Sequence, residues 1–289
     1  MGPEELNRFA LRHTSEISRT TVALFKHVSG EADHFGSGVL LQVEGTRFLV
    51  TAAHVTDEFF CEQWKQIFFG TPSEDDLLPV TTVRYCRSKK QTDPNREDDS
   101  LDLAVLELTA DVADKLSASM RFVTLSELEL DPDKLKDGKY LVNGYPDFRA
   151  EKDEMDQTIV AQNLPYFTGL YDMGRVPTPN ISPADHIVLD VNRMGEAGGL
   201  WDRLDLDETH GISGGGMWRV LDEDQPIESL DWRQAKLVAI VTDRSVPKVM
   251  GPVQYLRGTK IKHAVGFIHH GWPELRSAIE SAIPARLVR

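Results

Sequence analysis

The sequence lacks the features that mark several classes of protein. Its 289 residues include only two cysteines, Cys61 and Cys86, which are too few for a disulfide framework, so we expect two free thiols in a reducing compartment. No apolar run approaches the length of a membrane span. Residues 1–7 lack the basic and apolar regions of a secretory signal. We therefore expect a cytoplasmic protein that does not associate with membranes.

Positive charge is also scarce. The formal net charge is −14 at pH 7, which argues against binding to the phosphates of nucleic acids or to anionic lipid surfaces. The only suggestive histidine pair, His269-His270, has none of the accompanying ligands of a metal motif. We expect no cofactor and no metal, and we expect polypeptide or small-molecule partners.

Short segments rich in β-formers are abundant, whereas tandem repeats and regular strand–helix alternation are absent. The clearest pair, Val39–Val43 and Thr46–Thr51, flanks a Glu44-Gly45 turn. Further strands are expected at Thr21–Phe25, Gln66–Phe69, Val80–Tyr85, Leu101–Leu108, Tyr140–Asn143, Thr158–Gln162, Tyr166–Tyr171, His186–Val191, Met217–Leu221, Leu237–Thr242 and Val265–Ile268. This pattern predicts an all-β barrel or sandwich.

Helices are expected mainly at the two ends of the chain. Residues 3–18 read as an amphipathic helix, and Pro273 opens a closing helix. The charged, turn-rich stretch 125–138 reads as a link between two halves. The expected organisation is an N-terminal extension at 1–19, a first barrel at 20–124, the link at 125–138, a second barrel at 139–270 and a C-terminal helix at 271–289.

The main functional signal is a serine surrounded by glycines, Gly211-Ile212-Ser213-Gly214-Gly215-Gly216. Glycines allow backbone N–H groups to approach a reacting carbonyl. Upstream, His54 follows one apolar run in an expected short turn, and Asp102 begins another. Acyl transfer needs a nucleophile, a base, a carboxylate and oxyanion donors. We assign these roles to Ser213, His54, Asp102 and the N–H groups of Gly211 and Ser213.

Two neighbouring residues could orient the histidine instead of Asp102, namely Asp98 and Asp99. Asp102 is preferred because it directly precedes the apolar run Leu103–Leu108, where a carboxylate without a partner would be costly. His54 would be that partner.

In these motifs the chain resembles the trypsin-like (chymotrypsin-fold) serine peptidases of the non-secreted bacterial kind. The resemblance spans about Thr20 to Ile268 and has the family order of histidine, aspartate and serine. The matching segments are Gly36-Ser37-Gly38, Thr51-Ala52-Ala53-His54, Asp102-Leu103-Ala104-Val105-Leu106, Asn143-Gly144-Tyr145-Pro146 and Gly211-Ile212-Ser213-Gly214-Gly215. It implies two packed six-stranded antiparallel β-barrels, with the histidine and aspartate on the first, the serine on the second and the active site between them.

Two positions depart from the secreted members of that family. Val55 follows the histidine where they have a cysteine, and Ile212 precedes the serine where they have an aspartate that pairs with a newly cleaved amino terminus. Activation by that ion pair is not expected here. The oxyanion hole is therefore ordered in another way, or it forms only with a regulatory protein partner.

The resemblance also suggests residues of the substrate pocket. Asp207 stands six residues before Ser213, where trypsin-like members attract lysine or arginine. A wall strand with Thr242 and Arg244 would face the same pocket, and Arg244 would either neutralise Asp207 or select acidic side chains. His210 would lie at the rim. The charge preference of the pocket stays open.

These observations favour a serine endopeptidase, with a protein or peptide as its substrate, over two alternatives. One is a module of the same fold that binds peptides without cutting them. The other is an α/β-hydrolase esterase in which Asp243 and His263 complete a triad with Ser213, but its nucleophile turn needs a helix after the serine, and Gly214-Gly215-Gly216 begins a helix poorly.

Overall fold

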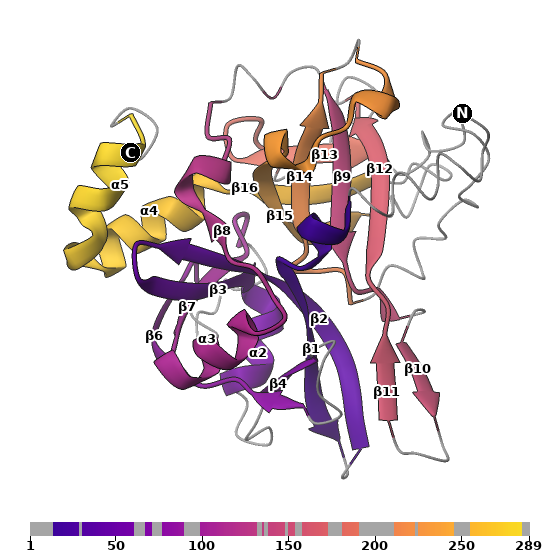
Figure 1. Ribbon diagram of the computed structural model, residues 1–289, viewed down its shortest axis with the longest axis vertical. Coiled ribbons are helices and arrows are strands. Elements are labelled where there is room, and N and C mark those ends of the chain that lie inside the picture. Colours follow the sequence, from indigo (N-terminus) through magenta and orange to yellow (C-terminus); the bar gives the residue numbers. More distant parts are fainter. Residues whose placement is uncertain are drawn as a thin grey trace.

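The structure is a computed structural model, and two β-sheet units make up most of it (Figure 1). It describes residues 14–28, 31–60, 67–70, 77–89, 99–131, 135, 138–147, 150–153, 158–172, 181–190, 211–222, 225–245 and 255–284. Residues 14–18 form a helical turn that leads into the first strand. The rest of the expected N-terminal helix, and Cys61, lie outside the described residues, whereas Cys86 is a free thiol.

The first sheet is built around the expected hairpin. Val43 pairs with Thr46 across the Glu44-Gly45 turn, and Glu44 has a positive φ of 52°, as tight hairpin turns require. The strands are β1 (Thr21–Val28), β2 (Glu31–Val43), β3 (Thr46–Ala52), β4 (Ile67–Gly70), β5 (Leu78–Pro79), β6 (Thr82–Arg87), β7 (Leu103–Leu108) and β8 (Val123–Thr124).

This sheet curls into a half-barrel. Its strand order is β5-β4-β1-β2-β3-β7-β6, with β8 added in parallel to β2. The two ends of this path, β5 and β6, follow each other along the chain with only residues 80–81 between them. The strand expected at Val80–Tyr85 corresponds to β6, which runs from Thr82 to Arg87. Apolar side chains of β1, β2, β3 and β7 fill the interior, including Leu24, Leu40, Leu49 and Leu106.

The second sheet is a closed six-stranded barrel with the order β12-β13-β16-β15-β14-β9. Its strands are β9 (Lys139–Gly144), β12 (Leu164–Leu170), β13 (His186–Asp190), β14 (Gly216–Leu221), β15 (Lys236–Ser245) and β16 (Tyr255–Lys260). A separate antiparallel ribbon of β10 (Ala150–Asp153) and β11 (Thr158–Ala161) extends from it toward β1 and β2 (Figure 1). The expected all-β, two-barrel fold is confirmed, with the second barrel closed and six-stranded and the first a half-barrel of eight strands.

Helices flank these sheets. They are α2 (Ala53–Phe60), α3 (Ala110–Ser117), α4 (Lys262–Gly271) and α5 (Arg276–Ala282), with short 3₁₀ turns at η2 (Leu125–Glu127), η7 (Ile227–Ser229), η8 (Trp232–Gln234) and η9 (Pro273–Leu275). No helix in the described segments is long and apolar enough to cross a bilayer.

Two local expectations were wrong. His54 lies in the first turn of α2 rather than in a short connecting turn. The strand expected at Val265–Ile268 is part of α4, where Ala264, Val265 and Ile268 are buried. That spacing places them on one helical face, and a short apolar run alone does not distinguish a buried strand from a helix. The helical end of the chain thus begins at Lys262, earlier than the expected residue 271.

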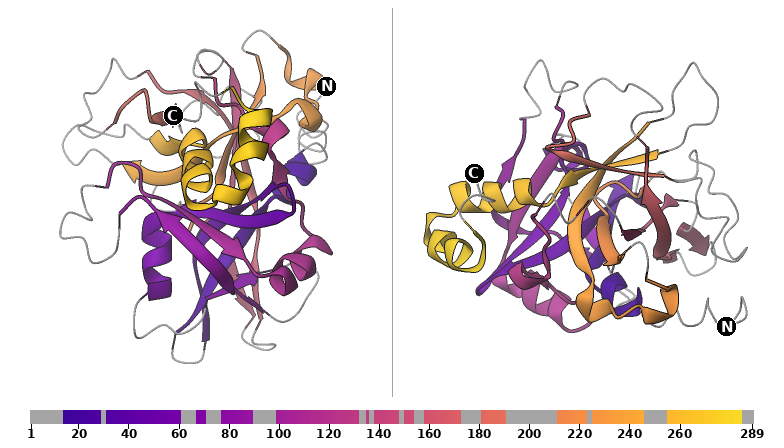
Figure 2. Two further views of the ribbon diagram at one scale, coloured as in Figure 1. Left: turned by 90° about the vertical axis from the view of Figure 1, so that its left-hand side faces the viewer. Right: turned by 90° about the horizontal axis from the view of Figure 1, so that it is seen from above.

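The C-terminal helices join the two units, because α4 follows the last strand of the second barrel yet packs on β6 and β7 of the first (Figure 2). The indole N–H of Trp272 donates to Glu107 Oε2 at 2.6 Å, and Arg84 Nε donates to the same oxygen at 2.6 Å. The Trp272 ring also packs edge-on against Phe48. These contacts fix the relative position of the sheets and hence of the seam between them.

Candidate functional site

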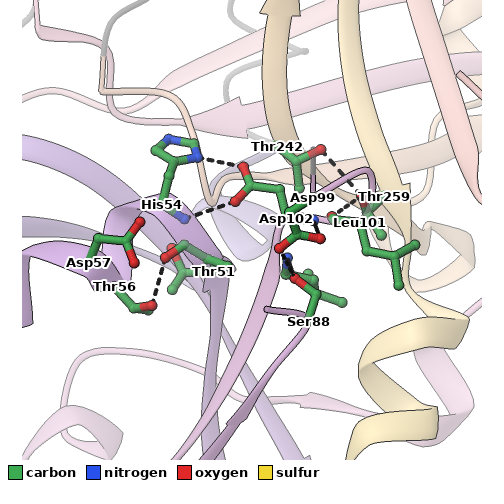
Figure 3. Close-up of polar contacts among 12 residues, drawn as sticks. Thr51, His54, Thr56, Asp57, Ser88, Asp99, Leu101, Asp102, Thr242 and Thr259 are labelled. Carbon is green, nitrogen blue, oxygen red and sulfur yellow. Dashed lines mark hydrogen bonds and ion pairs between the residues drawn. The ribbon is translucent and has the colours of Figure 1, made fainter. Parts of the chain in front are cut away.

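His54 and Asp102 meet at the seam, as the sequence predicted. The imidazole Nδ1 of His54 lies 2.5 Å from Asp102 Oδ2, and the His54 backbone N–H donates to Asp102 Oδ1 at 2.9 Å (Figure 3). An ionised carboxylate only accepts hydrogen bonds, so the proton is on Nδ1. The lone pair is then on Nε2, as a general base requires. The His54 side chain is 47% exposed and that of Asp102 only 10%.

Asp102 is held by its neighbours in an unusual backbone conformation, with a φ of +43°. Its N–H donates to Asp99 Oδ1 at 3.1 Å, and its carbonyl accepts from the N–H of Ala53 at 2.8 Å. Ser88 donates to the other oxygen of Asp99 and accepts from the N–H of Leu103. Asp99 therefore supports the backbone of Asp102 and does not take its place beside His54. Asp98 lies outside the described residues.

The second barrel holds the same loop from the other side. His186 Nε2 donates to the carbonyl of Ser100 at 2.7 Å while its Nδ1 accepts from the N–H of Ser182 at 3.0 Å. The Thr259 hydroxyl donates to the carbonyl of Leu101 at 2.5 Å. Burial lowers the pKa of His186, in keeping with a neutral ring that donates at one nitrogen and accepts at the other. The position of Asp102 thus depends on both barrels.

The segment that carries Ser213 is fixed to β2 by Ser37. The Ser37 hydroxyl donates to the carbonyl of Gly211 at 2.8 Å and accepts from the N–H of Tyr145 at 2.9 Å. The Ser37 N–H donates to the carbonyl of Ser213 at 2.8 Å. Ser37 is completely buried. One residue therefore fixes the Gly211 and Ser213 carbonyls, and with them the course of the proposed oxyanion loop.

The glycines around Ser213 are required by close packing. Gly214 has a φ of +91°, and a Cβ there would lie 1.8 Å from the Ser37 carbonyl oxygen. A Cβ on Gly36 would lie 2.8 Å from Val55 Cγ1 and 3.6 Å from the Ser213 carbonyl oxygen. Gly36 therefore lies close both to the backbone of Ser213 and to Val55, the residue that follows His54. Ile212 is buried against Gly144.

Of the four residues expected in the substrate pocket, the structure describes Thr242 and the backbone of Arg244. Thr242, on β15 of the second barrel, is 1% exposed, its hydroxyl lies 3.3 Å from that of Thr259, and it lies near Asp102 (Figure 3). The backbone of Arg244 pairs with Leu256 in the second barrel. Asp207 and His210 lie outside the described residues. The charge preference of the pocket therefore stays a prediction.

The arrangement around Ser213 does not fit an α/β-hydrolase. The serine is followed by strand β14, which begins at Gly216, whereas a nucleophile elbow is followed by a helix. His263 lies in α4, and its Nε2 is 2.9 Å from Asp185 Oδ1. The alternative triad with Asp243 and His263 is therefore rejected.

Comparisons with known proteins give similarity of structure alone. No family model matches the chain, and no curated protein matches its sequence. Among solved structures, the HtrA-type protease AlgW with a tripeptide and a serine-to-alanine form of the same protease are each similar, at 16% identity and a TM-score of 0.49 over 91% of this chain. The chain spans 64% of the length of those structures. No residue role in this chain is taken from them.

Sequence reasoning missed several supporting residues. Ser37 was noted only as part of a glycine motif, and the roles of Ser88, His186 and Thr259 have no local signature, because each depends on a partner far along the chain. Thr259 is completely buried in β16, a strand whose sequence reads as polar, so no apolar run marked it.

Proposed function

We propose that this chain is a trypsin-like serine endopeptidase that hydrolyses peptide bonds through an acyl-enzyme on Ser213. The observation that carries the proposal is the hydrogen-bonded pair of His54 and Asp102, with Nδ1 at 2.5 Å from Oδ2. This pair lies beside the strand to which the Ser213 loop is bonded through Ser37. Neither cofactor nor metal is needed for this chemistry.

In the proposed reaction, the Ser213 Oγ attacks the scissile carbonyl carbon while its proton passes to His54 Nε2. Asp102 retains the hydrogen bond from Nδ1 and stabilises the imidazolium. The N–H groups of Gly211 and Ser213 stabilise the negative charge on the carbonyl oxygen. When the C–N bond breaks, the imidazolium gives its proton to the leaving amine. A water molecule, deprotonated by His54, then hydrolyses the ester and restores the serine.

The test is a cleavage profile of the purified chain on a peptide library, with Ser213→Ala prepared in parallel. Cleavage by the natural chain and none by the variant is the expected result. The same profile gives the residue preferred before the cut, and thereby decides between the acidic and basic pockets allowed by Asp207 and Arg244. Equal cleavage by both proteins would assign the activity to a contaminant.

A regulatory protein partner stays a prediction, motivated by the hydrophobic Ile212 at the position before the nucleophile. If the purified chain cleaves peptides in the library experiment without any partner, that result would argue against a regulatory partner. Absence of any cleavage or covalent labelling, with candidate partners present, would favour the peptide-binding module instead.

A further inference from the structure

A buried hydrogen bond connects the two barrels next to the proposed oxyanion loop. His34, on β2 of the first barrel, has its Nδ1 2.7 Å from Oδ1 of Asp147, which follows β9 of the second. The His34 side chain is 2% exposed, whereas that of Asp147 is 46% exposed. The residues are 113 positions apart in the sequence. Because the carboxylate accepts, His34 donates from Nδ1.

This pair lies directly against Gly211. A Cβ on Gly211 would be 2.2 Å from Asp147 Oδ1 and 2.4 Å from His34 Cε1. Gly211 itself has a φ of +83°. Because glycine has no Cβ, its backbone can adopt other φ and ψ values about as easily as this one. On its other side, the Gly211 carbonyl accepts from Ser37. The glycine is thus enclosed between the hydrogen-bonded pair and the Ser37 hydroxyl.

Two features show that the position of His34 is unusual: a register shift in the strand pair that carries it, and a buried ring nitrogen without a hydrogen-bond partner in the described residues. The β1–β2 register shifts at this point, so that Leu24 pairs with Gly36 and Phe25 with His34, and such a bulge redirects a side chain. Nε2 of His34 is buried without a hydrogen-bond partner in the described part of the chain, and the ring packs edge-on to Phe25 at 5.3 Å. A buried polar atom left unsatisfied is uncommon and calls for an explanation.

We infer that the His34–Asp147 pair is the brace that orders the oxyanion loop of this chain, an inference that rests on the proposed function. By closing over the Cα of Gly211, the pair restricts the peptide that presents the Gly211 N–H to the substrate carbonyl. It performs the ordering that cannot come from an ion pair at position 212, where the buried residue is Ile212. His34 and Asp147 are positioning residues, and they touch neither the substrate nor the reacting atoms.

The kinetic test compares Asp147→Ala with Asp147→Asn on the best peptide from the library. Loss of one oxyanion donor costs about 100- to 1,000-fold in kcat, so a loop freed to rearrange should lower kcat by about 10- to 100-fold. KM should change by less than about threefold, since the donor acts in the transition state. Asp147→Asn keeps an acceptor for His34 and should stay within about threefold of the natural kcat.

The matched control is Asp114→Ala in α3, which removes the same charge from an exposed residue that forms an ion pair with Arg47 of β3. It should leave both constants unchanged. An unaltered kcat in Asp147→Ala, with active natural enzyme, would overturn the brace and leave the proposed function intact. A rise in KM alone would also overturn it, because the residue would then act on substrate binding.

A second readout does not require activity. In ¹⁵N-glycine-labelled protein carrying Ser213→Ala, the amide resonance of Gly211 is assigned by its loss in Gly211→Ala. The brace predicts that Asp147→Ala shifts or broadens this resonance, whereas Asp147→Asn and Asp114→Ala do not. An unmoved resonance in Asp147→Ala refutes the brace. A shifted resonance in a chain that cleaves nothing supports the brace and rejects the peptidase.

Discussion

Replacing Asp102 by asparagine should separate catalysis from stability. Asparagine keeps one oxygen that accepts from the His54 backbone, but it presents an NH₂ group to the imidazole. The proton then moves from Nδ1 to Nε2, which can no longer accept from Ser213. In the general serine-peptidase template this change costs about 10⁴-fold in kcat, or about 5.4 kcal/mol of transition-state stabilisation.

The structure also predicts how little Asp102→Asn should cost in stability. The backbone φ of +43° is one that aspartate and asparagine tolerate best among residues with a side chain. The main loss is a charged hydrogen bond exchanged for a neutral one, worth about 1 kcal/mol. Asp102→Ala loses both bonds to His54 and keeps the backbone strain, so it should be destabilised by about 2–4 kcal/mol.

Turnover of the selected peptide and urea unfolding measure the two effects. The control is Asp57→Asn, which removes an equal charge from α2 close to His54 (Figure 3). In the natural chain, Asp57 forms an ion pair with Arg87. This variant should retain kcat within about threefold, because the asparagine oxygen can still accept the hydrogen bond from the buried Arg87. Asp102→Asn with kcat within about tenfold of the natural value would refute the assignment of Asp102 as the residue that orients the base.

Three further changes test the framework of the site by urea unfolding. Gly214→Ala should lower the free energy of unfolding by about 3 kcal/mol or more, because the added Cβ would lie 1.8 Å from a backbone oxygen and the residue has a positive φ. The control is Gly45→Ala, whose added Cβ would have no atom within 4 Å. It should lower the free energy of unfolding by less than about 1 kcal/mol. Glu107→Ala should lose about 2–3 kcal/mol by leaving the Trp272 indole N–H buried and unpaired. Burial lowers the pKa of His186 from its ordinary value of 6.5, so the unfolded chain takes up the proton first. The stability from this residue is present above about pH 6.5 and is lost as pH falls further; His186→Gln should therefore weaken the acid dependence.

Each of these changes has a contradicting outcome. Equal losses in the two glycine variants would mean that Gly214 is not in the tight contact described. If Glu107→Ala were as stable as the natural chain, the contact between Glu107 and Trp272 would not help to hold the two barrels together. An unchanged slope of stability between pH 7 and 5 in His186→Gln would show that other groups carry the acid dependence.

The sequence predicted best where local pattern and chemistry agree. The apolar residues on both sides of Glu44-Gly45 predicted a hairpin whose second strand, β3, ends shortly before His54. The apolar run Leu103–Leu108 predicted the strand that begins directly after Asp102. Both signals depend on neighbours in the chain, and the structure places His54 and Asp102 in direct contact. The assignment of Ser213 as nucleophile remains a prediction that its position beside Gly36 supports.

What the sequence could not predict depends on contacts between distant segments. His34 and Asp147 come from opposite barrels, and neither belongs to a motif. Strand β16, Tyr255–Lys260, reads as polar and was missed, yet all of its residues are buried in the second barrel. Partners distant in the sequence accept from two of its polar side chains, since Thr259 donates to the Leu101 carbonyl and Lys260 to the Pro183 carbonyl. The short run Val265–Ile268 has the composition of a strand, and only its packing on the first sheet makes it a helix.

The most direct test of the central claim is covalent labelling of Ser213 by a fluorophosphonate, followed by mass spectrometry of the modified peptide. The account predicts a stoichiometric adduct on Ser213, formed at least about 10³-fold more slowly in His54→Ala because the base has been removed. No adduct on Ser213, or equal rates in the natural chain and His54→Ala, would contradict it.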